Sequence, residues 1–179
     1  LRVDANCAYS YQTALEHLKR LSDLQIHSIE QPIATGRWNE MAELCRQSPG
    51  PIALDEELIG ITSEEEMQKL VETIRPAYLI LKPSLHGGFA GCEQWISEAE
   101  KAGSDWWITS ALESNIGLNA IAQWTFHLKA QNEQGLGTGQ LFTNNFDSPL
   151  EIEGERLWFR PEKCWNIENL QNKETDDDF

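Results

Sequence analysis

The sequence predicts an α/β protein, and more closely part of a (β/α) barrel of the TIM type. Three observations lead to this fold class. Short apolar segments with the character of buried strands recur at a nearly constant interval, helical patterns lie between them, and each strand ends in a charged or polar residue. Strands joined in this order by helices run parallel, with right-handed crossovers.

Five segments have the character of strands. Each is too short for a helix and is bounded by proline, glycine or polar residues. The segments are LRVDAN, IHSIEQP, PIALDEE, AYLILKPS and DWWITSALES. The residues at their ends are Asp4, Glu30, Asp55, Lys82 and Ser110, which follow one another about every 26 residues.

Five other stretches show the apolar spacing of helices. Ser63 is a good N-cap, and Glu66 three residues later completes a capping box. Gly103 is typical of the position just after a helix. The helices that we expect cover residues 10–24, 38–45, 63–74, 91–103 and 115–128.

Two architectures fit this order of strands and helices. In an open, doubly wound sheet a ligand gathers at one switch point, whereas in a barrel all strand ends meet at one mouth. Because successive strands each end in an ionisable or polar group, the sequence favours the barrel. A closed barrel needs roughly 200 or more residues, so a chain of 179 residues predicts an incomplete one.

The charged strand ends predict a metal site. Taken singly, Asp4, Glu30, Asp55 and Lys82 each have an ordinary explanation as a cap or a surface charge, but four of them at the same place in successive units indicate a site. Oxygen ligands without histidine or cysteine are typical of a hard cation, Mg²⁺ before Mn²⁺ or Ca²⁺. A lysine beside such a metal suits removal of a proton next to a carboxylate, as in the enolase superfamily, a worked example of this pattern. The expected substrate is therefore a small carboxylate.

Composition and charge exclude other classes of function. The formal net charge of −15 disfavours binding to nucleic acid or to an anionic membrane surface. No apolar run has the roughly 18 residues that a membrane span needs, and there is no basic-then-apolar leader. Four dispersed cysteines without C-x-x-C spacing fit free thiols in a reducing compartment, so we expect a cytoplasmic protein.

Several motifs resemble a known family. DAN at Asp4, IEQP at Glu30, LDEEL at Asp55 and LKPSLHGG at Lys82 resemble the muconate-lactonizing branch of the enolase superfamily. The later ITSALESNIGLNAIAQW and GLGTGQLFTNNFDSPL are similar to the o-succinylbenzoate synthases of that branch. The resemblance runs from Leu1 to about Pro161, so residues 1–161 are expected to be the C-terminal part of the barrel domain. Residues 162–179 are expected to be a separate segment with an acidic tail.

The resemblance implies a set of roles. The reaction is a Mg²⁺-dependent dehydration that forms o-succinylbenzoate for menaquinone biosynthesis through an enediolate, catalysed by a carbon–oxygen lyase. The metal ligands would be Asp4, Glu30 and Asp55 at the ends of the third to fifth barrel strands, and the catalytic Lys82 would follow the sixth. The remaining expected site residues are Asn6 and Glu56, which would orient the metal ligands, and Thr109, Ser110, Gly135 and Gly137, which would contact the substrate.

One departure from the family pattern affects the expected activity. The family carries a K-x-K motif after its second strand, and the second lysine is the proton-abstracting base, but this sequence contains no K-x-K. The N-terminal capping domain is also absent. The resemblance therefore predicts an incomplete barrel of strands three to eight, inactive alone, whose natural partner is the missing N-terminal part. An N-succinylamino acid racemase or dipeptide epimerase, and a non-catalytic fragment, remain the alternatives.

Three further features lead to structural expectations. By resemblance, GLGTG at residues 135–139 is the final barrel strand, and the spacing of its glycines argues against nucleotide binding. The alternating PLEIEGERLWFRP predicts a β-hairpin with exposed apolar residues at Leu157, Trp158 and Phe159. His86 in the loop after Lys82 is more simply explained as a loop histidine than as a site residue.

Overall fold

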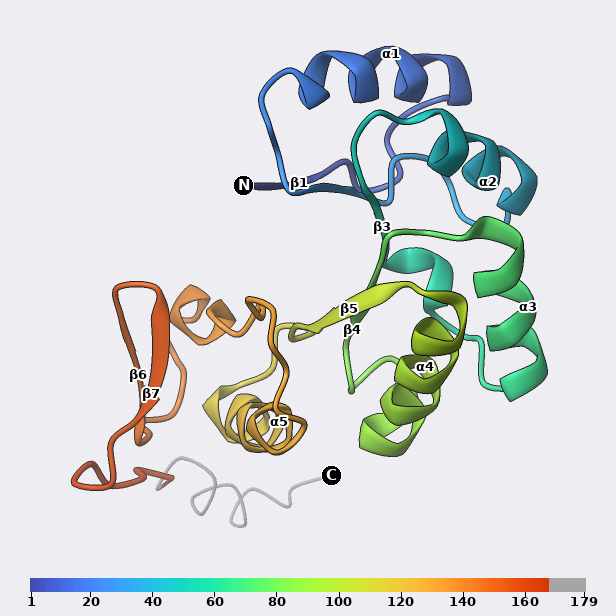
Figure 1. Cartoon of the computed structure of the whole chain (residues 1–179). Helices are drawn as coiled ribbons and strands as arrows, with labels where there is room; N and C mark the ends of the chain where they lie inside the picture. Colours follow the sequence, from blue (N-terminus) through green and yellow to red (C-terminus); the bar gives the residue numbers. More distant parts are fainter. Residues whose placement is uncertain (168–179) are drawn as a thin grey trace, which may run out of the picture. The chain divides into compact units, whose positions relative to one another are not determined.

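The computed structural model describes residues 1–167 and divides the chain into two compact units. The first unit is Leu1–Thr109 and holds five strands with four α-helices between them (Figure 1). The second unit begins at Ser110 and holds one α-helix, a 3₁₀ helix and a hairpin. The expected boundary at residue 161 stays a prediction, and the acidic end of the tail lies outside the described residues.

The five predicted strands are confirmed, and they form one parallel sheet in the order β1-β2-β3-β4-β5. Sequential order with parallel pairing is the arrangement of consecutive βα units in a barrel wall. The strands are β1 (Arg2–Asp4), β2 (Ser28–Glu30), β3 (Ile52–Leu54), β4 (Tyr78–Leu81) and β5 (Asp105–Ile108).

The helices of the first unit follow the predicted positions within a few residues. They lie side by side along the sheet, each next to the helix that precedes it in the chain (Figure 1). The Ser63 hydroxyl accepts a hydrogen bond from the Glu66 N–H at 3.2 Å, and Gly103 ends its helix at φ +77°. The helices are α1 (Tyr11–Ser22), α2 (Trp38–Gln47), α3 (Glu64–Ile74) and α4 (Gly88–Ala102).

The side chains of the strands divide into two sets, one on each face of the sheet. Successive side chains of a strand point to opposite faces. One set includes the buried residues Ile29, Leu54 and Leu79. The other set includes Ala53, Ile80 and Trp107, which pack together across three strands. The face of this second set is the one that leads to the charged strand ends.

The second unit contains α5 (Asn115–His127), η2 (Thr138–Leu141) and the antiparallel hairpin β6 (Leu150–Glu153) and β7 (Arg156–Phe159). The hairpin prediction is confirmed, and Trp158 and Phe159 are exposed as expected, whereas Leu157 is half-buried and does not face solvent fully. The predicted strand at 135–139 is wrong: only Gly135 is a single β-bridge residue, and the chain enters η2 at Thr138. Three glycines in five residues leave few side chains to support a strand.

None of the helices in residues 1–167 has the length and apolar character that a membrane crossing requires. All four cysteines carry free thiols, as the spacing predicts.

Candidate active site

The predicted site residues of the first unit lie together at the carboxyl edge of the sheet. Asp4 and Glu30 are the last residues of β1 and β2, and Asp55 and Lys82 directly follow β3 and β4. Thr109 follows β5, and its N–H donates to the carbonyl of Leu81 at 2.9 Å. In parallel α/β sheets this edge is where ligands bind.

Strand register places the four charged residues on the same face. Asp4 pairs with Glu30 and Glu30 pairs with Ala53, so Asp55, two residues further on, shares their face. Tyr78 pairs with Ala53, so Ile80 and Lys82, two and four residues further on, share this face as well, and Ile80 pairs with Trp107. The charged cluster therefore continues the face formed by Ala53, Ile80 and Trp107.

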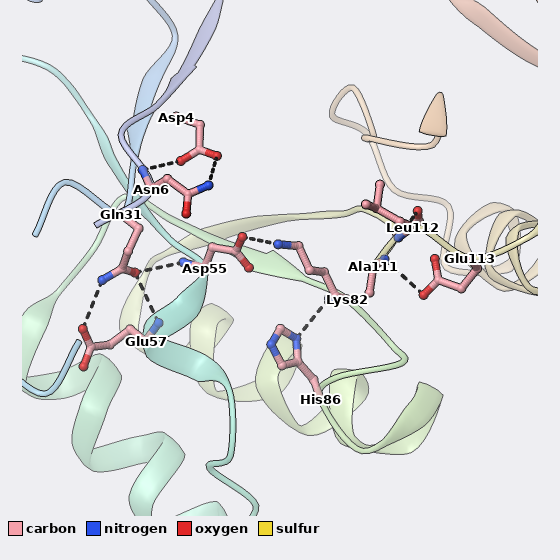
Figure 2. A network of polar contacts seen from close by, with 11 residues as sticks. Asp4, Asn6, Gln31, Asp55, Glu57, Lys82, His86, Ala111, Leu112 and Glu113 are labelled. Atoms are coloured by element: carbon pink, nitrogen blue, oxygen red, sulfur yellow. Dashed lines mark hydrogen bonds and ion pairs between the residues drawn. The ribbon is translucent and has the colours of Figure 1, made fainter. Parts of the chain in front are cut away.

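Asp55 and Lys82 form a partly buried ion pair. Lys82 Nζ donates to Asp55 Oδ2, as Figure 2 shows, and Asp55 is only 1% exposed. The other carboxylate oxygen, Oδ1, is buried, and no group of residues 1–167 donates a hydrogen bond to it. An orphaned buried carboxylate oxygen is costly unless it is bound by a donor or a cation.

The pKa of Glu30 is raised by burial and by the neighbouring carboxylates. Burial raises the pKa of its carboxyl to about 8, a hydrogen bond to Asp55 and the charges of Asp4 and Asp55 add to the rise, and Lys82 opposes it. Without a cation, the Glu30 carboxyl therefore binds a proton more tightly than a free glutamate does. A divalent cation would replace this proton.

Asn6 holds the first carboxylate of the series. Its N–H donates to Asp4 Oδ1 at 2.7 Å, and its Nδ2 donates to Oδ2 at 3.3 Å (Figure 2). Asn6 adopts a positive φ of 49°, which asparagine tolerates better than most residues and which closes this turn. The expected role of Asn6 in orienting the metal ligands stays a prediction, and its contact with Asp4 is compatible with it.

Glu56 directly follows Asp55, and its expected role in orienting the metal ligands stays a prediction. Glu56 is half-buried, and its pKa is raised by burial and then by the charge of Asp55. Its Oε2 is buried and has no hydrogen-bond partner within residues 1–167. Burial, and after it the Glu56 carboxylate, raises the pKa of the Cys7 thiol to about 11.

The carboxylates do not form a closed ligand cage in this arrangement. Within residues 1–167, no three His, Cys, Asp or Glu side chains are gathered closely enough to hold a metal ion. Asp4 is turned to Asn6, and Asp55 is paired with Lys82. The oxygen donors, the raised pKa of Glu30 and the orphaned Asp55 oxygen nevertheless fit a hard cation such as Mg²⁺.

Sequence reasoning missed two neighbours of this cluster. Gln31 and Glu57 are both buried and hydrogen-bonded to each other, and Gln31 also accepts from the Asp55 N–H at 3.2 Å. The available signal was the position of Gln31, a polar residue between Glu30 and a proline.

His86 is also closer to the cluster than a loop histidine needs to be. It is 2% exposed, and its Nδ1 accepts a hydrogen bond from the Lys82 backbone N–H at 3.0 Å. Burial lowers the pKa of its imidazole to about 4. The feature of the sequence that could have indicated this contact is the spacing of four residues between Lys82 and His86.

The remaining predicted substrate contacts belong to the second unit, which we describe by itself. Ser110 is buried, its hydroxyl hydrogen-bonds with that of Thr138, and it accepts from the Leu112 N–H at 3.0 Å. Gly135 and Gly137 lie in the loop before η2. Their contact with a substrate stays a prediction.

Comparison with known proteins identifies the family. Residues 1–163 match the family described as enolase C-terminal domain-like. The chain belongs to this family. Its enolase-superfamily fold, an α/β structure with a parallel sheet of barrel type, is thus confirmed.

Two of the similar proteins are an o-succinylbenzoate synthase and a solved structure from the same organism. The chain is 56% identical over 157 residues to the o-succinylbenzoate synthase of Desulfotalea psychrophila, covering 88% of this chain and 42% of that protein. The crystal structure of MenC from Desulfotalea psychrophila LSv54 matches with a TM-score of 0.84 and 56% identity, over 87% of this chain and 44% of that one.

A second kind of relative has another activity in its name. The N-succinylamino acid racemase of Thermus thermophilus is 37% identical over 117 residues, which are 65% of this chain and 31% of that protein. The enolase C-terminal domain-like chain thus spans less than half the length of the relatives that it matches.

Proposed function

We propose that this chain provides the metal ligands and the lysine of an o-succinylbenzoate synthase, a lyase that removes water from its substrate. The observation that carries the proposal is the placement of three carboxylates and Lys82 on one face at the carboxyl edge of the sheet. The 56% identity to an o-succinylbenzoate synthase supports the choice of reaction within the family.

In this proposal Asp4, Glu30 and Asp55 hold Mg²⁺, or Mn²⁺ in its place. Bound there, the cation supplies positive charge against the negative charge that develops on a substrate carboxylate when the adjacent proton is lost. Asn6 keeps the Asp4 carboxylate in a fixed orientation by its two hydrogen bonds.

Lys82 contributes a cation of its own. Its ammonium is held at the carboxyl edge by Asp55 and is partly exposed, so it can face a bound substrate from that edge. There it stabilises developing negative charge. We assign substrate contact to Thr109, Ser110, Gly135 and Gly137. The chain contains no K-x-K motif, so in this proposal the base and the capping domain come from a segment outside these 179 residues.

The substrate is a small carboxylate, and we propose a cytoplasmic location because four free thiols fit a reducing compartment. No role in binding nucleic acid or membrane follows from a formal net charge of −15.

A chimera tests the reaction. The matched 157-residue region of the Desulfotalea psychrophila synthase is replaced by that of this chain, so that the relative supplies the rest of the enzyme. We expect Mg²⁺-dependent formation of o-succinylbenzoate, lost in Lys82→Met and Glu30→Gln. The isolated chain is expected to be inactive. A folded chimera without this activity, beside an active unmodified relative, would refute the proposal.

The second candidate is N-succinylamino acid racemisation, favoured by the 37% identity to the Thermus thermophilus racemase. The same chimera is given N-succinylamino acids, and loss of optical rotation is followed. Racemisation without dehydration would replace the first proposal. If neither reaction occurs and the isolated chain binds no Mg²⁺ in calorimetry, the chain is a non-catalytic fragment.

A further inference from the structure

Gln31 occupies an unusual position between two of the proposed metal ligands. It directly follows Glu30, it is 0% exposed, and its φ is +33°, in a region that residues other than glycine rarely adopt. A buried residue held in such a conformation must be fixed by its surroundings. The hydrogen bonds of Gln31 show what fixes it.

The backbone of Gln31 joins three strand ends. Its N–H donates to the carbonyl of Ala53, within β3, at 2.9 Å, and its own carbonyl accepts from the Cys7 N–H, shortly after β1, at 2.8 Å. Because Gln31 itself follows β2, the backbone of this one residue connects the loops that follow Asp4 and Glu30 to the strand that leads to Asp55.

The side chain of Gln31 adds a direct hold on Asp55. Its Oε1 accepts from the backbone N–H groups of Asp55 at 3.2 Å and Glu57 at 3.3 Å (Figure 2). Its Nε2 donates to the Ile33 carbonyl at 3.1 Å and to Glu57 Oε2 at 3.2 Å. The side-chain amide therefore uses both its acceptor and its donors.

Glu57 anchors this amide to the loop before α2. Its Oε1 accepts from the Gly36 N–H at 2.7 Å and from Trp38 Nε1 at 2.9 Å. Glu57 is 4% exposed, so its charge is dispersed over these donors and over Gln31. The result is a chain of hydrogen bonds from Trp38 through Glu57 and Gln31 to the Asp55 backbone.

We propose that Gln31, oriented by Glu57, is a positioning residue that fixes the spacing of the Glu30 and Asp55 carboxylates for the cation. The inference rests on the proposed metal site and adds the residue that organises it. Only an amide satisfies the position: a glutamate has no N–H to donate to Glu57 when ionised, and an apolar residue leaves the Asp55 N–H without its acceptor. Substitution of a residue that orients metal ligands typically lowers metal affinity or activity by about 10-fold to 100-fold.

The test compares Gln31→Met with Gln68→Met in the 179-residue chain. The control residue also donates from its amide to a glutamate, Glu72 at 2.8 Å, but on the exposed side of α3. Mg²⁺ affinity is measured by calorimetry, bound Mn²⁺ by its electron paramagnetic resonance spectrum, and metal-free stability by urea unfolding. A milder variant, Trp38→Phe, removes one donor from Glu57 and leaves every proposed ligand and Gln31 in place.

We expect Gln31→Met to weaken Mg²⁺ binding by about 10-fold to 100-fold and to alter the Mn²⁺ spectrum. Trp38→Phe should weaken binding less and in the same direction, and Gln68→Met should not change it. A purely structural role would lower the urea midpoint and leave the affinity of the folded molecules unchanged, which overturns the inference. If Gln31→Met does not fold, an unchanged Mg²⁺ affinity in Trp38→Phe overturns it. If the wild-type chain binds neither cation, the proposed metal site itself fails.

Discussion

The pH dependence of stability should reveal how His86 is held. Its Nδ1 accepts the Lys82 N–H, and its Nε2 is buried without a partner in the described part of the chain. Protonation would destroy the acceptor at Nδ1 and place a charge in a buried site. The folded protein therefore requires the neutral imidazole.

The size of the effect follows from the pKa. Burial is the main cause that lowers the His86 pKa from 6.5 to about 4; the charge of Lys82 also lowers it, and Asp55 opposes the change. Because the unfolded chain binds the proton more tightly, this contribution is fully present above pH 6.5 and is lost as the pH falls toward 4. A difference of about 2.5 pKa units corresponds to about 3 kcal/mol, most of which is lost by pH 4.5.

The measurement is urea unfolding of wild type and His86→Leu at pH 7.5 and pH 4.5. At pH 7.5 the variant should be less stable by about 1–3 kcal/mol, because the Lys82 N–H loses its acceptor. At pH 4.5 this deficit should shrink by about 2.5 kcal/mol, since leucine has no proton to exclude. His127→Leu, at an exposed position of α5, is the matched control. A deficit for His86→Leu that is equal at both pH values would refute the reasoning.

Three other predictions test the site and its frame. Folding raises the pKa of Glu30 to about 8, so without metal the free energy of unfolding should fall as the pH rises from about 4.5 to 8. Glu30→Gln should remove this fall, as measured by urea midpoints across that pH range. Gly91→Ala should cost about 1–3 kcal/mol or more in urea unfolding, since the new methyl group overlaps the His86 carbonyl. The control Gly50→Ala places its methyl group more than 4 Å from every heavy atom of residues 1–167 other than those of residue 50 itself and its chain neighbours. Ser63→Ala should cost about 1 kcal/mol in the same assay, through loss of the cap of α3.

The sheet could be predicted because its information is local and repeated. Each strand is a short apolar run closed by a polar residue, and the constant interval gives the order and direction of the strands. The alternation of side chains then places Asp4, Glu30, Asp55 and Lys82 on one face. The glycine-rich segment at 135–139 lacks both signals, and there the predicted strand is wrong.

The supporting residues could not be found in the same way, because their partners are distant in the sequence and their backbone leaves the regular pattern. Gln31 acts on Asp55 and Glu57, 24 and 26 residues away, from a positive φ that no residue pattern encodes. His86 meets Lys82 only because the intervening turn folds back on the strand end, with the His86 N–H donating to the Lys82 carbonyl at 3.1 Å. A strand period therefore specifies which carboxylates reach the edge of the sheet. The turns that follow the strands specify how those carboxylates are aimed, which is why the variants of Gln31 and His86 test more of this site than further substitutions of its ligands.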